Sequence, residues 1–378
     1  KNLMISLKKL AREQNKTIIM VTHTTANLHL CDKIIFMGPG GRLCFCGNVE
    51  EAKQFYKTDD LVNIYNMIAA DPMKWEQDYQ RYRRLDGRTG EMGQRAEKLS
   101  MTKERAGIRQ FLVLLQRYTE LMFNDRQRLF VLLLQPCLIA VLLYIVADEN
   151  IFKIYESTKS MLFALSCSGI WIGLFNSIQE ICKERTIVKR EYMANLRLSG
   201  YVLSKFVFQM ALGGLQAVLL TMIFLKLAGN EKEGIFLDHF SPEMLLTVWL
   251  TVLASIALGF VISAVVKTGD KAMAIAPFVL IIQLLFSGIL FTLEGAGEVI
   301  SYVTVSRWSV EGLGSIAKLN RLDLKLQADY PMLEHEAESF FKATGAHVTQ
   351  CWGILIFMTL LFLVVSMISL RRIAKDTR

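Results

Sequence analysis

The sequence lacks the features that mark several common classes of protein. Its seven cysteines show no disulfide framework, so a reduced environment or plain packing explains them. It shows no signal peptide, and Lys1 opens within a helical pattern, so we expect the C-terminal portion of a longer protein. It contains no G-x-x-x-x-G-K-S/T phosphate loop, and we therefore expect no ATP binding or hydrolysis by this chain alone.

Apolar residues, by contrast, are abundant. Of the 378 residues 52% are hydrophobic, and the mean hydropathy of +0.33 is too high for an ordinary soluble domain of this length. The formal net charge of +8 could indicate nucleic-acid binding, but the excess lies largely in loops and tails that flank apolar runs, where membrane orientation explains it. We expect a membrane protein in contact with lipids and not with nucleic acid.

Six apolar stretches approach the ~20 residues that are needed to cross the hydrocarbon core of a bilayer. They are residues 129–146, 161–181, 206–227, 244–266, 272–291 and 351–370. Residues 108–124 precede them with an amphipathic pattern, as in a helix that lies along the inner leaflet. The predicted fold is a mainly α membrane protein, with an amphipathic connecting helix and a six-helix transmembrane domain over residues 125–378.

The charges of the connections give the predicted spans a direction. Residues 182–200 join the second and third spans and carry five basic residues against two acids. An excess of Lys and Arg in a short loop marks the cytoplasmic side of a membrane. The turn at 267–271 and the tail after residue 370 are also basic, whereas the connections after the first and third spans carry more acid. Both ends of the membrane domain are therefore expected in the cytoplasm.

Two longer connections flank this arrangement. Residues 292–350 predict a large external loop, in which residues 301–308 suit the headgroup level of the membrane. Its polar part, residues 322–347, has no Cys and no N-x-S/T, which favours a bacterial plasma membrane over a secretory-pathway protein. On the cytoplasmic side, residues 57–107 predict a helical linker with a glycine-rich joint.

Residues 1–56 have an α/β pattern. A first helix is followed by residues 17–23, an apolar run with a polar tip at His23, as in a buried parallel strand. A helix is expected from Thr24 or Thr25, and residues 32–37 and 42–47 predict a hairpin around the turn at 38–41. This amount of α/β structure is too small for a whole nucleotide domain.

A zinc site is the alternative reading of the cysteines in this segment. Cys44 and Cys46 would point to one face of a strand, with His29 and Cys31 upstream. His29 and Cys31 lie on the predicted helix, where residues two apart diverge. We therefore predict no metal site.

The stretch TIIMVTHTTANLHLCDKIIFMGPGGRLCFCG resembles the end of the ATP-binding domain of an ABC transporter. The resemblance implies that His23 is the switch histidine, which contacts the γ-phosphate and helps to hold the attacking water. A satisfied structural histidine is the alternative. The phosphate loop, the signature motif and the strand-end Asp-Glu pair of that family would lie upstream of Lys1. ATP and Mg²⁺ would therefore be bound by the full-length protein, mostly through residues outside this chain.

The order of parts that follows resembles the G-type (White-like, ABC-2 class) transporters. That order is an amphipathic helix, six spans, a charged first intracellular loop and a large external loop before the last span. The resemblance implies a pair of membrane domains, which suggests a homodimer, and a charged loop that docks on the ATP-binding domain. The residues expected in this coupling loop are Lys183, Glu184, Arg185, Arg190 and Glu191. Ion pairs within the loop are the alternative role of these charges.

The same resemblance implies that substrate passes between the second and fifth spans. Side chains available there are Phe175, Asn176, Gln179, Gln283, Phe286 and Ser287. Asn176 and Gln179 are spaced to lie on one helical face. Polar groups at membrane depth usually face protein or a cavity, so hydrogen bonds between helices are the alternative role for each of them.

The function expected from these patterns is that of an ATP-driven exporter. This chain would supply the permease domain and the switch-histidine end of the ATPase. The neutral and aromatic pathway candidates favour an amphipathic or lipid-like substrate, which the sequence does not identify. A catalytically inactive membrane scaffold or sensor is the alternative from another class. A channel would need a more continuous polar stripe than Asn176, Gln179 and Gln283 provide.

Overall fold

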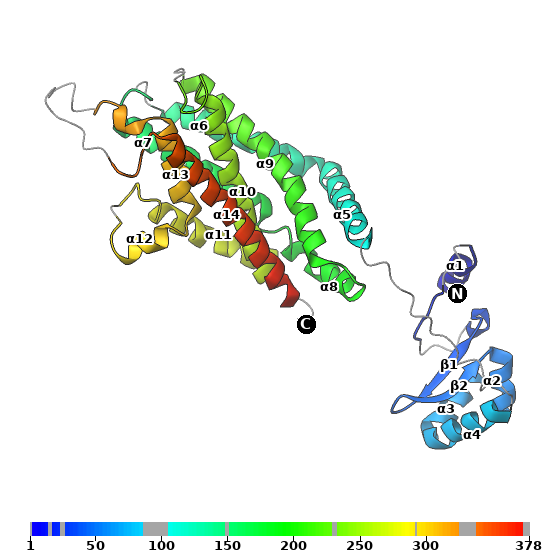
Figure 1. Cartoon of the computed structure of the whole chain (residues 1–378). Coiled ribbons are helices and arrows are strands. Elements are labelled where there is room, and N and C mark those ends of the chain that lie inside the picture. Colours follow the sequence, from blue (N-terminus) through cyan, green and yellow to red (C-terminus); the bar gives the residue numbers. More distant parts are fainter. Residues whose placement is uncertain are drawn as a thin grey trace. The chain divides into compact units, whose positions relative to one another are not determined.

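The computed structural model describes residues 2–13, 17–22, 27–85, 105–147, 151–228, 233–291, 293–324 and 338–372 (Figure 1). The chain divides into two compact units, Lys1–Met101 and Thr102–Arg378. Both are mainly helical, and the first also holds a two-stranded sheet. The predicted mainly α fold is confirmed.

The predicted strand before His23 is not formed. Helix α1 spans Asn2–Glu13, but residues 17–22 have no regular structure, and Ile19 and Val21 are almost fully exposed. A parallel strand needs hydrogen-bonded neighbours, and the sheet in the described part of this unit consists of β1 and β2 alone. The helix expected after His23 is reduced, within the described residues, to a single 3₁₀ turn, Leu28–Leu30.

The predicted hairpin is confirmed. Strands β1 (Ile34–Gly38) and β2 (Arg42–Gly47) are antiparallel. The turn between them needs glycine because Gly40 and Gly41 have φ of 77° and 75°. Helix α2 (Val49–Tyr56) starts with a capping box, in which Asn48 accepts from the Glu51 backbone N–H and Glu51 accepts from that of Asn48.

Two further helices pack on the hairpin. They are α3 (Leu61–Ala70) and α4 (Pro72–Leu85). Phe45 is fully buried between Phe55 and Tyr79, with ring centroids 5.5 Å from each. Tyr79 also donates a hydrogen bond of 3.1 Å to the backbone carbonyl of Cys46. Residues 61–85, predicted as part of a linker, thus share a core with the hairpin. The glycine-rich joint at 87–93 lies outside the described residues.

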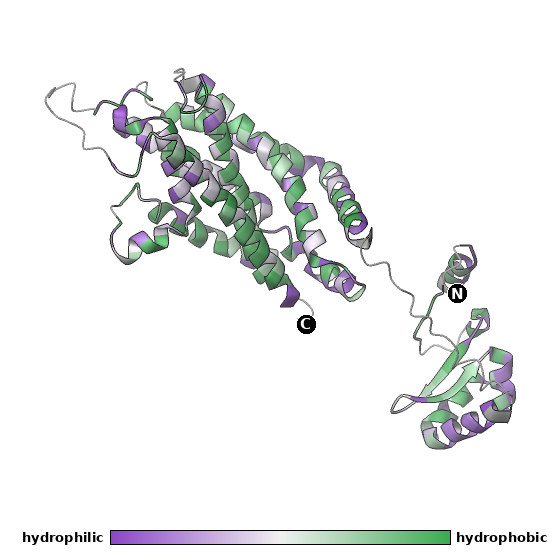
Figure 2. Cartoon of the chain, in the orientation of Figure 1, coloured by the Kyte–Doolittle hydropathy of each residue, from purple (hydrophilic) through white to green (hydrophobic). Residues whose placement is uncertain are grey.

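The second unit is a bundle around one central helix. Its elements are α5 (Arg105–Asn124), α6 (Arg126–Val146), α7 (Tyr155–Ser177), α8 (Arg185–Met193), α9 (Leu198–Ala228), α10 (Ser241–Val265), α11 (Gly269–Leu285), α12 (Ala296–Ser301), α13 (Val305–Ile316) and α14 (Gly345–Leu370), with 3₁₀ turns at Cys182–Glu184 and Leu319–Arg321. Helix α10 packs against α7, α9, α13 and α14. Figure 2 shows that apolar residues cover the long helices of this unit.

Five helical segments in the described residues are long and apolar enough to cross a membrane. They are Arg126–Val146, Tyr155–Met193, Leu198–Lys226, Ser241–Val265 and Gly345–Leu370. The fifth predicted span, residues 272–291, is not among them, because α11 has only 17 residues and ends at Leu285. The chain turns there, with Gly288 at a φ of 78°, and continues into α12 and α13.

Helices α7 and α10 approach each other closely. A Cβ added to Gly173 of α7 would lie 2.4 Å from the carbonyl oxygen of Val252, and one added to Gly259 of α10 would clash with the Ser177 hydroxyl. Small residues let backbones approach in membranes, where dispersion contacts and hydrogen bonds replace the hydrophobic effect as the driving force. These glycines make α7 and α10 a single packed pair.

Helix α13 is a core element. The sequence places residues 301–308 at the headgroup level, but all 12 residues of α13 are buried, and the helix packs against α7, α10 and α14. Arg307 and Trp308 are only 9% and 7% exposed. Both side chains therefore contact protein more than solvent or lipid, and their depth in the membrane stays a prediction. Hydroxyl contacts anchor the helix, since Ser309 lies 2.7 Å from the Oγ of Ser166 on α7.

The amphipathic segment at 108–124 lies within α5. Its buried residues Leu114, Tyr118 and Met122 recur every four positions and therefore share one helical face. That face packs on α9, where Tyr118 and Phe208 meet edge to face with centroids 5.2 Å apart. Other apolar residues of α5, including Leu112 and Leu121, are exposed.

Candidate functional site

His23 lies outside the described residues. The structure therefore gives no contact or orientation for the predicted switch histidine, and its role stays a prediction. The Cys44 thiol is buried and lies within hydrogen-bond distance of the backbone carbonyls of Arg42 and Pro72, at 3.6 and 3.7 Å. Burial raises the pKa of this thiol above its usual value.

The predicted coupling loop is an ordered helical segment. After α7 a 3₁₀ turn, Cys182–Glu184, leads directly into α8, Arg185–Met193, and α9 begins at Leu198. Two backbone N–H groups, of Ile181 and Cys182, donate to the Ser263 hydroxyl of α10 at 3.0 Å. The inner end of α7 is thereby fixed to the end of α10.

The two acids of this loop bind other elements of the same unit. Glu184 lies 3.0 Å from the Lys205 ammonium and accepts a hydrogen bond of 2.8 Å from Tyr201, both on α9. Glu191 lies 2.6 Å from Arg117 on α5. Ion pairs to α9 and α5 thus hold the 3₁₀ turn and α8 in place.

The three basic residues predicted for the coupling loop divide into two groups. Arg185 donates to the carbonyls of Ala264 and Val266 at 2.8 and 3.0 Å, which satisfies acceptors at the end of α10 and places a positive charge at the negative end of its dipole. Lys183 and Arg190 are exposed, and neither side chain makes a hydrogen bond or ion pair within the described residues.

A buried ion network lies directly behind this loop. Glu180, 4% exposed, is bound by the Arg128 guanidinium of α6 and the Tyr118 hydroxyl of α5. The Lys205 ammonium lies 3.6 Å from its carboxylate and donates to its backbone carbonyl at 3.0 Å. The two carboxylates, Glu180 and Glu184, are balanced by two cations, Arg128 and Lys205. The network therefore connects α5, α6 and α9 to the turn that follows α7 through matched charges, of which Glu180 and Lys205 are buried.

The predicted pathway residues of α7 contact different elements. Asn176 is buried and donates to the Gln216 side chain of α9 at 2.5 Å, which is a hydrogen bond between helices. Gln179 reaches the Gly269 carbonyl at 3.5 Å, at the start of α11. The helix ends at Ser177, so the helical spacing that would place these two residues on one face does not continue to Gln179.

The candidates near α11 are also tied to the same chain. Gln283 is buried, its side-chain carbonyl accepts from the Ser306 backbone N–H at 3.1 Å, and its backbone carbonyl accepts from the Ser306 hydroxyl. Ser287 donates to the Leu284 carbonyl at 2.8 Å. Phe286 is half-buried at the end of α11. The polar candidates therefore join α11 to α13 and close the turn after α11.

An aromatic surface is left on α7. Trp171 is 47% exposed and stacks on the half-buried Phe175, with ring centroids 5.2 Å apart and planes inclined by 20°. Helix α11, which packs beside α7, exposes Phe278, Ile281 and Ile282. Within the described residues these side chains are exposed apolar surface on two helices that pack side by side.

Comparison with known proteins identifies the class to which this arrangement belongs. The family model described as ABC-2 type transporter matches residues 109–317, more than half of the chain. The chain belongs to the ABC-2 type transporter family. It is also similar to an ABC transporter ATP-binding/permease protein of Mycobacterium tuberculosis, with 26% identity over 338 residues that cover 85% of this chain. The chain spans 38% of the length of that relative.

The buried network of this ABC-2 membrane domain was missed by sequence reasoning. Two signals were available, since Glu180 lies inside a predicted span and Lys205 directly precedes another. An ionisable residue inside a membrane segment usually has a partner. The sequence did not show which residues would pair, because Tyr118 and Glu180 are 62 positions apart.

Proposed function

We propose that this ABC-2 chain is the C-terminal portion of an ATP-driven, G-type exporter of an amphipathic or lipid-like substrate. The observation that carries the proposal is the similarity to an ATP-binding/permease protein. The matched region covers 85% of this chain, which is more than the membrane unit Thr102–Arg378 alone can account for. The similarity therefore extends into Lys1–Met101. A hairpin followed by helices in that unit is the closing part expected of an ATP-binding domain.

The membrane unit would act as one of two permease halves, in a homodimer. The uncovered aromatic face of α7 and α11 supports this, because Trp171 and Phe175 expose stacked rings beside the apolar surface of α11. A second copy facing this surface would enclose a path lined by aromatic and aliphatic side chains. Such a path suits a substrate with large apolar parts.

Coupling to the ATPase would run through the 3₁₀ turn and α8. Lys183 and Arg190 are exposed and can meet acidic groups of an ATP-binding domain, while Glu184 and Glu191 hold the segment to α9 and α5. A displacement of the 3₁₀ turn and α8 would therefore be transmitted directly to α7 and α9. His23 would supply this chain's contact with the γ-phosphate, and the remaining ATP and Mg²⁺ ligands would lie outside the chain.

The test is ATP hydrolysis and phospholipid movement by the full-length protein reconstituted in vesicles. A fluorescent phospholipid serves as the transport probe. His23→Ala is compared with His29→Ala, which changes an exposed histidine nearby. We expect hydrolysis by the parent protein, a loss of about 10²-fold or more in His23→Ala, and no loss in His29→Ala.

Each result has a defined consequence. No nucleotide hydrolysis by the parent protein would contradict the exporter and support a catalytically inactive scaffold or sensor. Equal rates of ATP hydrolysis in His23→Ala and His29→Ala would support an active ATPase but contradict the role assigned to His23. Hydrolysis without movement of any lipid probe would contradict the proposed substrate class.

A further inference from the structure

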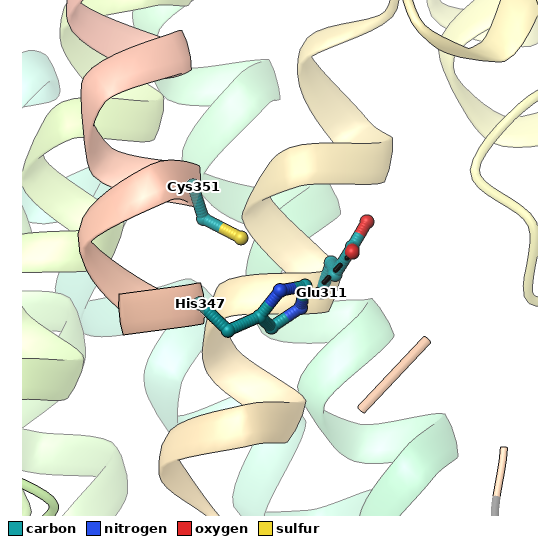
Figure 3. A group of neighbouring side chains, drawn as sticks. All are labelled: Glu311, His347 and Cys351. Carbon is teal, nitrogen blue, oxygen red and sulfur yellow. Dashed lines mark ion pairs between the residues drawn. The ribbon is translucent and has the colours of Figure 1, made fainter. Parts of the chain in front are cut away.

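Three side chains of metal-ligand type meet where α13 contacts the start of α14. Glu311 comes from α13, and His347 and Cys351 come from the first turns of α14. Their ligand atoms all lie within 4.8 Å of one another. Figure 3 shows the imidazole of His347 between the Glu311 carboxylate and the Cys351 thiol. This is the only such group of three found within the described residues.

The local backbone explains why they meet. Helix α14 begins at Gly345, so His347 and Cys351, four residues apart, lie one above the other on the same face. On α13, the residue after Glu311 is Gly312, where an added Cβ would lie 3.5 Å from the Cys351 Cβ, the distance of an ordinary van der Waals contact. The two helices therefore pack directly against each other at this point, which brings Glu311 close to the first turns of α14.

The carboxylate of this group is buried and incompletely bonded. Glu311 is 5% exposed, and one of its oxygens, Oε1, lies 3.0 Å from His347 Nε2. The other oxygen, Oε2, forms an ion pair with Arg307 Nε at 3.7 Å, but neither atom makes a hydrogen bond within the described residues. A buried carboxylate oxygen without a hydrogen bond is costly, which points to a ligand that would bind there.

We propose that Glu311, His347 and Cys351 bind a divalent transition-metal ion of the zinc class. Oxygen, nitrogen and sulfur donors together match the preference of Zn²⁺, whose bonds of ~2.0–2.3 Å require ligand atoms somewhat closer than 4.8 Å. A small rotation of the side chains would achieve this. Binding converts the Cys351 thiol to a thiolate and releases its proton to solvent, and the fourth coordination position is left for water.

The surroundings suit such a site. Cys351 is fully buried, whereas the His347 side chain is 13% exposed and gives the ion a way in. Arg307 stays beside Glu311 as an outer partner, with its guanidinium over the rings of Tyr302 and Phe340 at 4.2 and 5.0 Å. The bound ion would join the last span to α13, and through α13 to α7 and α10.

The experiment measures metal in the full-length protein, purified and equilibrated with Zn²⁺ and then with a weak chelator. His347→Gln and Cys351→Ser are compared with the parent and with two matched controls, His29→Gln and Cys182→Ser. We expect the two site variants to hold one equivalent of zinc less per chain than the parent, with an affinity at least about tenfold lower. The controls should retain the full content. Equal zinc in parent and site variants would overturn the proposal.

A second measurement separates lost binding from lost folding. Co²⁺ in place of Zn²⁺ should produce a thiolate-to-cobalt charge-transfer absorption in the parent and in His29→Gln, and none in Cys351→Ser. Unfolding midpoints without metal show whether each variant is folded, and His347→Gln, which changes the partly exposed ligand, remains usable if Cys351→Ser is not. Zn²⁺ should raise the unfolding midpoint of the parent, and it should not raise the midpoint of His347→Gln or Cys351→Ser. A folded His347→Gln variant that is stabilised by Zn²⁺ as much as the parent would also contradict the site.

Discussion

The Lys205 ammonium lies 3.0 Å from the Glu184 carboxylate, and this ion pair ties α9 to the turn that follows α7. The Lys205 side chain is 3% exposed, and its ammonium also lies over the Tyr118 ring at 4.3 Å. Because the same ammonium lies 3.6 Å from the buried Glu180 carboxylate, one cation pairs with two acids.

Replacement of Lys205 by Met should lower the free energy of unfolding by about 3–5 kcal/mol, since Glu180 and Glu184 would lose a buried counter-charge. Lys267→Met, at an exposed residue, is the control and should change the free energy of unfolding little. Thermal unfolding of the full-length protein in detergent measures both. Equal unfolding midpoints for the two variants would show that the ion pair is not required for stability.

The close contact of α7 with α10 gives a second prediction. Gly173→Ala should destabilise the protein by about 1–3 kcal/mol, because the added Cβ would lie 2.4 Å from the Val252 carbonyl oxygen. Gly353→Ala is a matched control on α14, where nothing lies within 4 Å of an added Cβ. The same unfolding assay compares them. A Gly173→Ala variant as stable as Gly353→Ala would mean that the helices separate at little cost.

The exposed cations of the coupling loop give a third prediction. Lys183→Glu with Arg190→Glu should reduce lipid movement by the full-length protein at least about tenfold, because both charges that face a partner are reversed. Stability should be kept, since both side chains are exposed and neither makes a hydrogen bond or ion pair within the described residues. Arg321→Glu, at an exposed residue in the connection before α14, is the control. Transport that survives the double reversal would place the coupling contact elsewhere.

The aromatic face of α7 gives a fourth prediction, on the assembly. Trp171→Cys should form a disulfide between two copies under mild oxidation, because this face would lie at the dimer interface. Phe357→Cys, on α14 and 63% exposed, should not. Non-reducing electrophoresis of membranes detects the cross-linked dimer. Cross-linking of Phe357→Cys but not of Trp171→Cys would place α14, and not α7, at the interface.

The local sequence predicted the parts of the fold that depend on short-range patterns. The hairpin around Gly40 and Gly41 and the amphipathic helix within 105–124 follow from turn chemistry and periodicity, and the structure contains both. Membership of the ABC-2 type family, expected from the order of parts, is confirmed. Five of the six predicted spans correspond to helices that meet the length and hydropathy requirement.

Predictions that depended on long-range contacts were less accurate. The strand at 17–22 reads as apolar and β-branched, but a strand exists only where a neighbour supplies its hydrogen bonds. Residues 301–308 were predicted to lie at the headgroup level, and the sequence did not show that α13, which begins at Val305, is buried along its whole length. For Asn176 the sequence left a pathway role and a hydrogen bond between helices open, and its partner Gln216 could not be known from local sequence.

The sequence by itself determined the class of protein, because long apolar runs and the sign of the loop charges restrict a chain to a membrane and suggest its direction. Only the tertiary structure decided which charged side chains form ion pairs and which are exposed to solvent. It paired Glu184 with Lys205, left Lys183 exposed, and brought Glu311 to Cys351 across two helices. Hydropathy is a property of each segment, whereas charge pairing depends on distances of a few ångströms between segments that only packing sets.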